Sequence, residues 1–503
     1  MTVEIGTSGL SRHDVVAVAR EGAGVKLGAD ARAAIAASAA LVEAAAAAAD
    51  PVYGVSTGFG SLATTVIPPE RRAELQRALL RSHAAGMGDP VETDVVRAMM
   101  LLRARTLAMG YSGVRPVVVE RLCDLLNHGI TPPVPEHGSL GASGDLAPLA
   151  HVGLALIGEA DAATAAQLAA AGLEPVELRA KEGLALINGT DGVLGMLVLA
   201  LADLGRVLRA ADVAAAMSVE ALLGTDRAFA ADLMALRPHA GQTAAGANLR
   251  ALLDGSEIVA SHRVDDPRVQ DAYSLRCAPQ VNGAARDAVD YAIGVADVEL
   301  RSAIDNPTVL LDGRVESCGH FHGAPVALAC DVLAVAIAPV GAIAERRTDR
   351  LLDRNRSQGL PPFLVTDAGV NSGLMIAQYT QAAMVAENRR LAVPASVDSI
   401  PTSAMQEDHV SMGWGAARKL RRTVANLGRI VAVELVAAAR ALELRAPLRP
   451  AAGTAAAVAA LRHAGVAGHG PDRHVAPELA RAEQAVMSGA VVRAVEDALG
   501  ELA

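Results

Sequence analysis

Aromatic residues are scarce in this chain. Only 2% of its 503 residues are Phe, Trp or Tyr, although hydrophobic residues make up 52%. The core must therefore be filled by Ala, Leu and Val, and such side chains suit closely packed helices. A chain of this length predicts two or three domains, or one elongated helical body.

Blocks of positive charge and long uninterrupted apolar runs are also missing. The formal net charge is -10, from 45 basic and 55 acidic residues, so nothing in the charge pattern supports nucleic-acid binding. The opening MTVEIGTSGL lacks the basic and apolar regions of a signal peptide. The apolar run 332–344 has roughly 13 residues, short of the ~18 that cross a bilayer. We expect a cytoplasmic protein without nucleic-acid or membrane partners.

Cysteine and lysine are too few, or badly placed, for several common cofactors. The four cysteines have no CxxC spacing, which indicates a reducing compartment rather than a disulfide framework. Only three lysines could form a pyridoxal Schiff base, and none has a recognisable context. The glycine-rich segments match no phosphate-binding or dinucleotide fingerprint. The two histidines of GHFHG (319–323) lack a suitably spaced carboxylate, so we predict no metal and no external cofactor.

Proline and glycine divide the chain into predicted helices. We predict a mainly α fold with two domains, a mixed but mostly helical domain at 1–190 and a long-helix bundle at 191–503. The first domain carries an irregular loop at 131–144, and residues 449–473 resemble a loose insertion. The helices expected from this punctuation lie at 30–49, 69–86, 93–109, 116–129, 191–222, 284–303, 324–355, 371–391 and 411–446.

The few aromatic residues are unusually placed. Five of the nine Tyr and Phe residues lie in irregular, polar or Gly/Pro-rich segments, where a core-filling residue is not expected. Each one alone could simply anchor a loop, but as a set they favour a binding site. These five residues are Tyr53, Phe59, Tyr273, Phe321 and Phe363.

Three polar segments add candidate site residues. Gln270, Tyr273 and Arg276 recur at three-residue spacing, which would place them on one face of a helical turn. Arginine is the natural bidentate partner of a carboxylate, although a surface helix with an ion pair would look the same. The cluster Gln-Glu-Asp-His at 406–409 could equally be a helix cap. Asn188 lies in a turn, where asparagine is usually structural.

The segment GSLGASGDLAPLAH (138–151) closely resembles the signature of the histidine and aromatic amino acid ammonia-lyase family. Ala142, the residue before the serine, is within the range of that family. The resemblance extends over nearly the whole chain and implies a homotetramer with active sites shared between subunits. The other motifs, in the order of the family, are YGVSTGFG, RSHAAGMG, KEGLALINGTDG, VQDAYSLRCAPQV, DNPTVL, GHFHGAPVA, NRSQGLPPFLV, GVNSGLMIAQYT and PTSAMQEDHVSMG.

The resemblance also implies a prosthetic group that the chain makes itself. In this family an Ala-Ser-Gly triad cyclises and loses water to give 4-methylideneimidazol-5-one (MIO). Here the triad is Ala142, Ser143 and Gly144. The Gly144 nitrogen must attack the Ala142 carbonyl carbon, which demands a compressed turn of small residues. Ser143 then loses its hydroxyl, and no external cofactor is needed.

Roles for the candidate residues follow from the same resemblance. Tyr53 resembles the residue that transfers a proton at the β-carbon, and Arg276 resembles the clamp for the substrate carboxylate. Tyr273 and Asn188 resemble residues that order the MIO group and the substrate backbone. Residues that resemble site-shaping positions are Gln270, Phe321 and Gln406, and those that resemble the imidazole-recognising pair are His83 and Glu407.

The substrate can be argued physically. A phenyl ring would leave a buried Glu407 without a donor, which is costly, whereas an imidazole N–H supplies one. His83 adds a second polar partner, although it could also interact with a helix dipole. These residues predict deamination of L-histidine to trans-urocanate. A tyrosine or phenylalanine ammonia-lyase, an aminomutase and an inactive helical scaffold remain alternatives, while a fumarase-type lyase lacks its usual substrate-loop motif.

Overall fold

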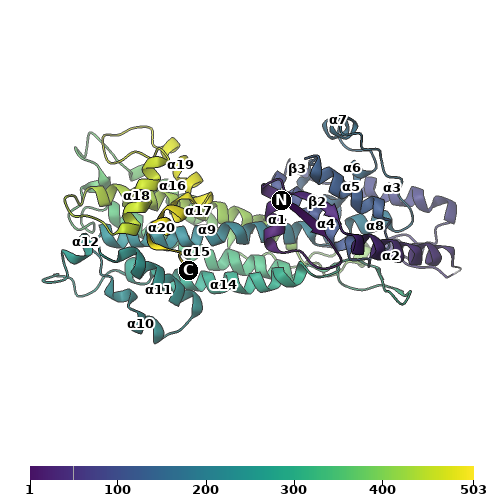
Figure 1. Cartoon of the computed structure of the whole chain (residues 1–503), viewed down its shortest axis with the longest axis horizontal. Coiled ribbons are helices and arrows are strands. Elements are labelled where there is room, and N and C mark those ends of the chain that lie inside the picture. Colours follow the sequence, from purple (N-terminus) through teal and green to yellow (C-terminus); the bar gives the residue numbers. More distant parts are fainter. Residues whose placement is uncertain (49) are drawn as a thin grey trace. The chain divides into compact units, whose positions relative to one another are not determined.

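The computed structural model describes residues 1–48 and 50–503, which form two compact units (Figure 1). Unit 1 comprises Met1–Leu199, Ala292–Asp331 and Ala395–Arg418, and unit 2 comprises Ala200–Tyr291, Val332–Pro394 and Lys419–Ala503. Each unit is therefore built from separate stretches of chain, whereas the predicted domains 1–190 and 191–503 are contiguous.

Unit 1 begins with short helices whose starts and ends follow from local sequence. A capping box at Ser11 and Asp14 begins the first helix, and Pro116 opens the fifth, as predicted. The Ala-rich helix ends at Ala47, and its predicted end at 49 lies outside the described residues. The helices are α1 (Arg12–Arg20), α2 (Ala29–Ala47), α3 (Arg72–His83), α4 (Thr93–Ala108), α5 (Pro116–Asn127), α6 (Leu146–Leu156), α7 (Ala162–Ala170) and α8 (Glu182–Ile187).

Sheet structure in the described residues is limited to three two-stranded pairs. Strand β1 (Thr2–Ile5) pairs in parallel with β2 (Gly24–Leu27), and β5 (Thr308–Val309) pairs antiparallel with β6 (Val315–Glu316). Strand β3 (Met87–Pro90) pairs antiparallel with β4 (Pro135–His137). The last pair matters for function, because β4 leads directly into the triad loop.

The core of unit 1 is organised around α4. Every residue from Val95 to Ala108 is buried, and this helix contacts α1, α2, α5 and α6. Three of its buried residues are charged, namely Arg97, Arg103 and Arg105, and the last two lie almost wholly out of solvent. Buried charges require nearby partners, and Arg103 lies 3.3 Å from the carboxylate of Asp191 at the start of the next long helix.

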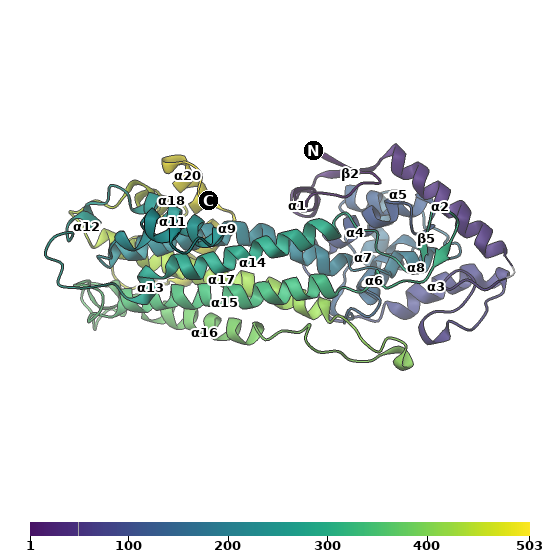
Figure 2. The same ribbon diagram turned by 90° about the horizontal axis from the view of Figure 1, so that it is seen from below.

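Long helices follow α8, as the sequence predicts, with ends shifted by a few residues. They are α9 (Asp191–Ala221), α14 (Ala278–Glu299), α15 (Ala324–Leu352), α16 (Met375–Leu391) and α17 (Gly413–Glu443). Figure 2 shows the helices α9, α15 and α17. Within unit 2, Glu434 of α17 accepts hydrogen bonds from Ser218 of α9 at 2.6 Å and from Arg347 of α15 at 2.5 Å. A fully buried ion pair thus joins α15 to α17, and the Ser218 hydrogen bond adds α9.

The rest of unit 2 contains shorter helices and corrects one prediction. Residues 449–473 are not simply a loose insertion, because the Ala-rich stretch forms a helix that packs against three other helices, Ala240–Leu253, Ala476–Met487 and Ala490–Leu499. These shorter helices are α10 (Ala231–Ala235), α11 (Ala240–Leu253), α12 (Glu257–Ala260), α13 (Tyr273–Arg276), α18 (Ala452–His463), α19 (Ala476–Met487) and α20 (Ala490–Leu499).

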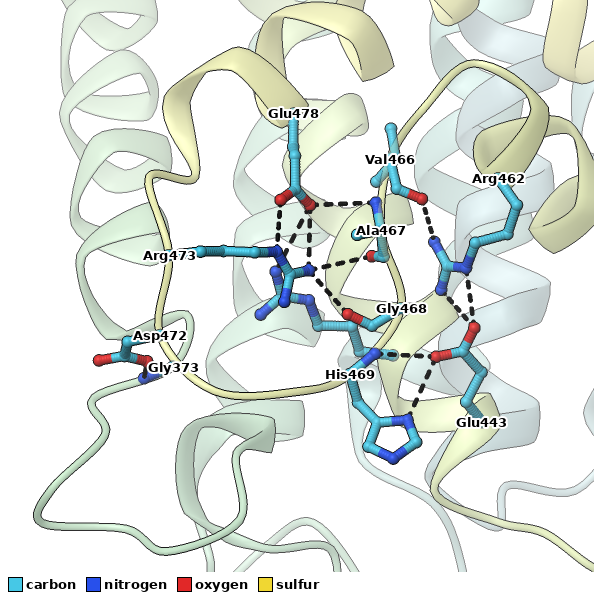
Figure 3. A network of polar contacts seen from close by, with 11 residues as sticks. Gly373, Glu443, Arg462, Val466, Ala467, Gly468, His469, Asp472, Arg473 and Glu478 are labelled. Carbon is cyan, nitrogen blue, oxygen red and sulfur yellow. Dashed lines mark hydrogen bonds and ion pairs between the residues drawn. The ribbon is translucent and has the colours of Figure 1, made fainter.

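The loop between α18 and α19 is held by charged hydrogen bonds (Figure 3). Glu478 accepts hydrogen bonds from Arg473 at 2.5 Å and from the Ala467 N–H at 3.2 Å. Asp472 accepts from the N–H groups of residues 372 and 373 at 2.7 and 2.8 Å. The loop thereby holds the segment that leads into α16.

Among the described residues, two helical stretches are long and apolar enough to cross a membrane by length and composition alone. They are Glu182–Ala221 and Ala324–Leu352. Both are longer than the uninterrupted apolar run 332–344. The apolar window of the first is 100% buried inside the chain, and that of the second is 61% buried. Such burial is typical of a core helix.

Candidate active site

The triad lies in a tight turn between β4 and α6. Ser143 has a φ of 56° and Gly144 a φ of 83°, and Gly141 and Gly144 form an isolated backbone bridge. A left-handed serine is uncommon. A Cβ on Gly144 would lie 2.3 Å from the carbonyl oxygen of Gly189, so glycine is required there. The turn is therefore tight and leaves no room for a side chain at position 144.

Asp145, the residue that follows the triad, holds this turn in place. It is the N-cap residue of α6, but its fully buried carboxylate caps the start of α9 instead, accepting from the N–H groups of Gly192 and Val193 at 2.9 and 3.0 Å. Its own N–H donates to the Gly189 carbonyl at 2.8 Å. Burial raises the pKa of Asp145 to about 7, although the hydrogen bonds oppose this change.

Asn188 lies beside the triad, as the resemblance implies. It follows α8, is buried, and accepts a hydrogen bond from Ser143 Oγ at its Oδ1, at 3.0 Å. Its Nδ2 donates to the carbonyl of Asn306. The amide is therefore held with its oxygen toward the triad.

Two cavities meet at the triad, and every residue that lines them belongs to unit 1. The larger cavity has a volume of about 650 Å³, and the other has a volume of about 570 Å³. Both are lined by Tyr53, Ala142, Ser143 and Glu407. The larger adds Phe321 and Gln406, whereas the smaller has a mainly apolar wall and adds His83.

Tyr53 is half-buried at this junction. Its hydroxyl oxygen accepts a hydrogen bond from the Gly60 N–H at 3.2 Å. Burial raises the pKa of Tyr53, and the negative charge of Glu407 raises it further. Because its pKa is raised, the phenol favours its protonated form in this chain. A role as base would be helped by a lower pKa.

His83 and Glu407 both line the smaller cavity. His83 Nδ1 lies 3.0 Å from the Leu79 carbonyl, so Nδ1 carries the proton and Nε2 keeps its lone pair. Burial lowers the pKa of His83, which favours this neutral form. The buried Oε2 of Glu407 has no hydrogen-bond partner among the described residues. A donor group of a ligand would satisfy such an unpaired oxygen.

The other three predicted site residues lie in unit 2. Tyr273 and Arg276 are the ends of the single-turn helix α13, with the guanidinium carbon 4.8 Å from the Tyr273 ring centroid. Gln270 precedes this helix, so the prediction that all three residues share one helical face is wrong for Gln270. Arg347 Nη1 donates to the Ser274 carbonyl at 3.3 Å, which anchors the turn. The side chain of Tyr273 is exposed.

Sequence reasoning missed a pair of stacked histidines in the larger cavity. The rings of His322 and His409 lie with centroids 5.8 Å apart and planes 5° from parallel. From the sequence alone, His322 is only a weak candidate for a metal ligand, and His409 has no role beyond the cluster 406–409. No sequence pattern signals a contact between positions so far apart. Among the described residues, no group of three or more His, Cys, Asp or Glu side chains is placed to hold a metal ion.

Comparison with known proteins adds the family. The model of the aromatic amino acid lyase family matches residues 10–463. The chain belongs to this family. It is 62% identical to the histidine ammonia-lyase of Streptomyces coelicolor over 509 residues, which covers 100% of this chain and 99% of that relative. The resemblance predicted from the triad segment and the other motifs is thereby confirmed.

Solved structures of the family share the fold. The tyrosine aminomutase of Streptomyces globisporus is 38% identical, with a TM-score of 0.94 over 100% of both chains. The histidine ammonia-lyase of Trypanosoma cruzi is 39% identical, with a TM-score of 0.90 over 99% of this chain and 96% of that one. The predicted mainly α, long-helix fold is confirmed, whereas the roles of individual site residues stay predictions.

Proposed function

We propose that this aromatic amino acid lyase is a histidine ammonia-lyase, which converts L-histidine to trans-urocanate and ammonia without oxidation. Full-length curated relatives at 61% and 62% identity carry that name. The observation that supports the substrate most directly is that two residues with free acceptor atoms, His83 and Glu407, line one cavity beside the triad.

The proposed electrophile is MIO, formed from Ala142, Ser143 and Gly144 without an external cofactor. The left-handed Ser143 and the obligatory glycine at 144 fit a backbone poised to cyclise. When formed, the group supplies an electrophile that makes the substrate's amino group a better leaving group. The chain's own residues must then bind the substrate, orient it and move its β-proton.

Ring recognition falls to His83 and Glu407. Each presents an acceptor atom, so the ligand ring must supply N–H donors. A phenyl ring supplies none, and burying both acceptors against it would leave them unpaired. An imidazole supplies a donor and fills a cavity whose remaining wall is largely apolar. The site therefore favours L-histidine over L-phenylalanine.

Proton transfer at the β-carbon is assigned to Tyr53. Its raised pKa means that the phenolate is a minor form at neutral pH, so the proposed base acts best under alkaline conditions. The Gly60 N–H bonded to the phenol oxygen stabilises the charged form in part. Phe321 and Gln406, in the larger cavity, would shape the space around the substrate.

We further propose a cytoplasmic homotetramer in which subunits share active sites. Arg276 would clamp the substrate carboxylate, with Tyr273 and Gln270 beside it, yet all three lie in unit 2. All residues that line the triad cavities lie in unit 1. Supply of these three side chains by a neighbouring subunit would complete the site.

The first test mixes the purified protein with L-histidine and follows the ultraviolet band of urocanate. L-tyrosine and L-phenylalanine run in parallel, and Ser143→Ala is the control. Urocanate from the native protein, and none from the control, is the expected result. Coumarate or cinnamate instead of urocanate would contradict the proposed substrate. No product from any substrate, with the triad matured, would contradict an ammonia-lyase altogether.

A further inference from the structure

A buried ion pair lies next to the active site without a part in the chemistry described above. Lys181 Nζ is 2.7 Å from Asp305 Oδ2, and the two side chains are 0% and 2% exposed. Lys181 also has a left-handed backbone, with a φ of 68°, at the start of α8. Burying both charges is costly unless further hydrogen bonds satisfy them, so the surroundings of this pair need an explanation.

The second oxygen of Asp305 holds the backbone that follows it. Asp305 Oδ1 accepts from the N–H of Asn306 at 2.7 Å, so one carboxylate is bonded to both Lys181 and this peptide. The Asn306 side chain is held as well, because its Oδ1 accepts from the Cys318 N–H at 2.8 Å. Arg103 donates to the carbonyl of Ile304 at 2.8 Å. The segment 304–306 is therefore fixed by two buried cations.

This segment controls the orientation of Asn188. The carbonyl of Asn306 accepts from Asn188 Nδ2, which leaves Asn188 Oδ1 facing Ser143 Oγ at 3.0 Å. If the Asn306 carbonyl moved, the amide could turn and present its NH₂ group instead. The atom beside Ser143 would then change from an acceptor to a donor.

We propose that Lys181 and Asp305 are positioning residues for the ammonia-lyase reaction, which act through Asn306 to keep the Asn188 oxygen directed at residue 143. This inference rests on the proposed function, since the substrate's amino group is a hydrogen-bond donor that must approach residue 143. An acceptor fixed there orients that group without reorganisation during the reaction. The buried ion pair thus helps to hold the Asn188 oxygen accurately in position at the site.

The decisive variant removes both charges together, Lys181→Met with Asp305→Leu, in the full-length protein. Replacement of a buried ion pair by apolar residues is often tolerated by a fold, so this double variant separates stability from positioning. The ultraviolet band of the matured triad gives the fraction of active subunits. We expect kcat per matured site to fall about 10- to 100-fold, with little change in KM for L-histidine.

A coupling test identifies Asn188 as the intermediary. The same double change is made in an Asn188→Ala background, where the atom that it positions is gone. If the pair acts through Asn188, the double change costs little more there, and the losses do not multiply. Multiplied losses, or an unchanged kcat per matured site in the double variant, would overturn the proposal.

The control is a buried ion pair of unit 2, Arg440 with Glu478, whose side chains are 5% and 6% exposed (Figure 3 shows Glu478). Arg440→Met with Glu478→Leu should keep the wild-type kcat per matured site, and an equal loss there would contradict a specific role for Lys181 and Asp305. Should the first double variant fail to fold, Asp305→Asn, which keeps the side-chain size, is measured instead, with the same expected loss in kcat.

Wild-type turnover of L-histidine is measured first, so that the proposed function is tested separately. If the wild-type protein does not turn over L-histidine, the positioning proposal is tested by the fraction of chains that show the matured triad band. A turned Asn188 amide would also disturb Ser143 and so lower this fraction. The fraction should then fall in Lys181→Met with Asp305→Leu and stay unchanged in the unit 2 control. Equal fractions in the two variants would overturn the proposal on this readout as well.

Discussion

Tyr53 shares its cavities with a carboxylate, and this neighbour determines the sign of a pH effect. Burial and Glu407 both raise the pKa of Tyr53. If the phenolate is the base, histidine turnover rises with pH as Tyr53 ionises. Glu407→Gln removes the negative charge and should move this rise to lower pH, by roughly half a pH unit. A profile of kcat against pH for both proteins measures the shift.

The same profile also tests the base itself. Tyr53→Phe has no phenol to ionise, so the alkaline rise should vanish and turnover should drop by about 100-fold or more. The triad band must be intact for the comparison to count. Near-normal turnover by Tyr53→Phe with a matured triad would show that another group takes the β-proton.

Asp145 makes the stability of the folded protein depend on pH, because its carboxyl group is protonated more readily in the folded protein than in the unfolded chain. Its pKa is about 7 in the folded protein, against an ordinary value of 3.8. Between these values the unfolded chain has lost a proton that the folded protein keeps. Stability therefore falls as pH rises from about 4 to about 7, by up to about 1.4 kcal/mol per pH unit from this group. Asp145→Asn should flatten the melting temperature against pH in that window, and parallel curves would contradict the assignment.

At the scale of elements, the triad turn depends on how closely it approaches the start of α9. A Cβ at position 144 would meet the Gly189 carbonyl at 2.3 Å, in a backbone with a φ of 83°. Gly144→Ala should therefore displace the turn and abolish both the triad band and turnover. Gly129→Ala is the matched control, because Gly129 has a φ of 67° with open space around its Cβ. It should cost about 1 kcal/mol of stability and leave turnover unchanged.

Helix positions were largely predictable because their signals are local. Prolines and glycines mark the helix ends, and the long helices differ from their predicted bounds by a few residues. The prediction failed for 449–473, where alanine-rich sequence resembles a linker but forms α18 against α11 and α20. Composition alone does not distinguish these outcomes, since the packing partner decides whether such a segment folds.

The candidate site was predictable only in part, for a related reason. Each of the predicted residues that line the two cavities lies in a motif that resembles the family, and their roles stay predictions. These are the triad, Tyr53, His83, Phe321, Gln406 and Glu407. The stacked His322 and His409, and the pairing of Lys181 with Asp305, depend on contacts across 87 and 124 positions. Only the folded chain brings such residues together, and no local sequence pattern predicts these contacts.

At the scale of the whole molecule, the two units divide the predicted site residues cleanly. The triad and its cavity residues belong to unit 1, whereas Gln270, Tyr273 and Arg276 belong to unit 2. This division allows a test of shared sites by subunit mixing. Ser143→Ala and Arg276→Ala should each be nearly inactive alone, because one lacks the electrophile and the other lacks the carboxylate clamp.

When the two variants are produced together, subunits that complement each other can build intact sites. If a site takes residue 143 from one subunit and residue 276 from another, random mixing leaves about a quarter of the sites intact, and about a quarter of wild-type turnover should return. Ser143→Ala mixed with Tyr53→Phe is the control, because Ser143 and Tyr53 line the same cavities within unit 1. That mixture should recover almost nothing. If Ser143→Ala with Arg276→Ala also recovered nothing, although mixed tetramers had formed, each site would draw both residues from a single subunit.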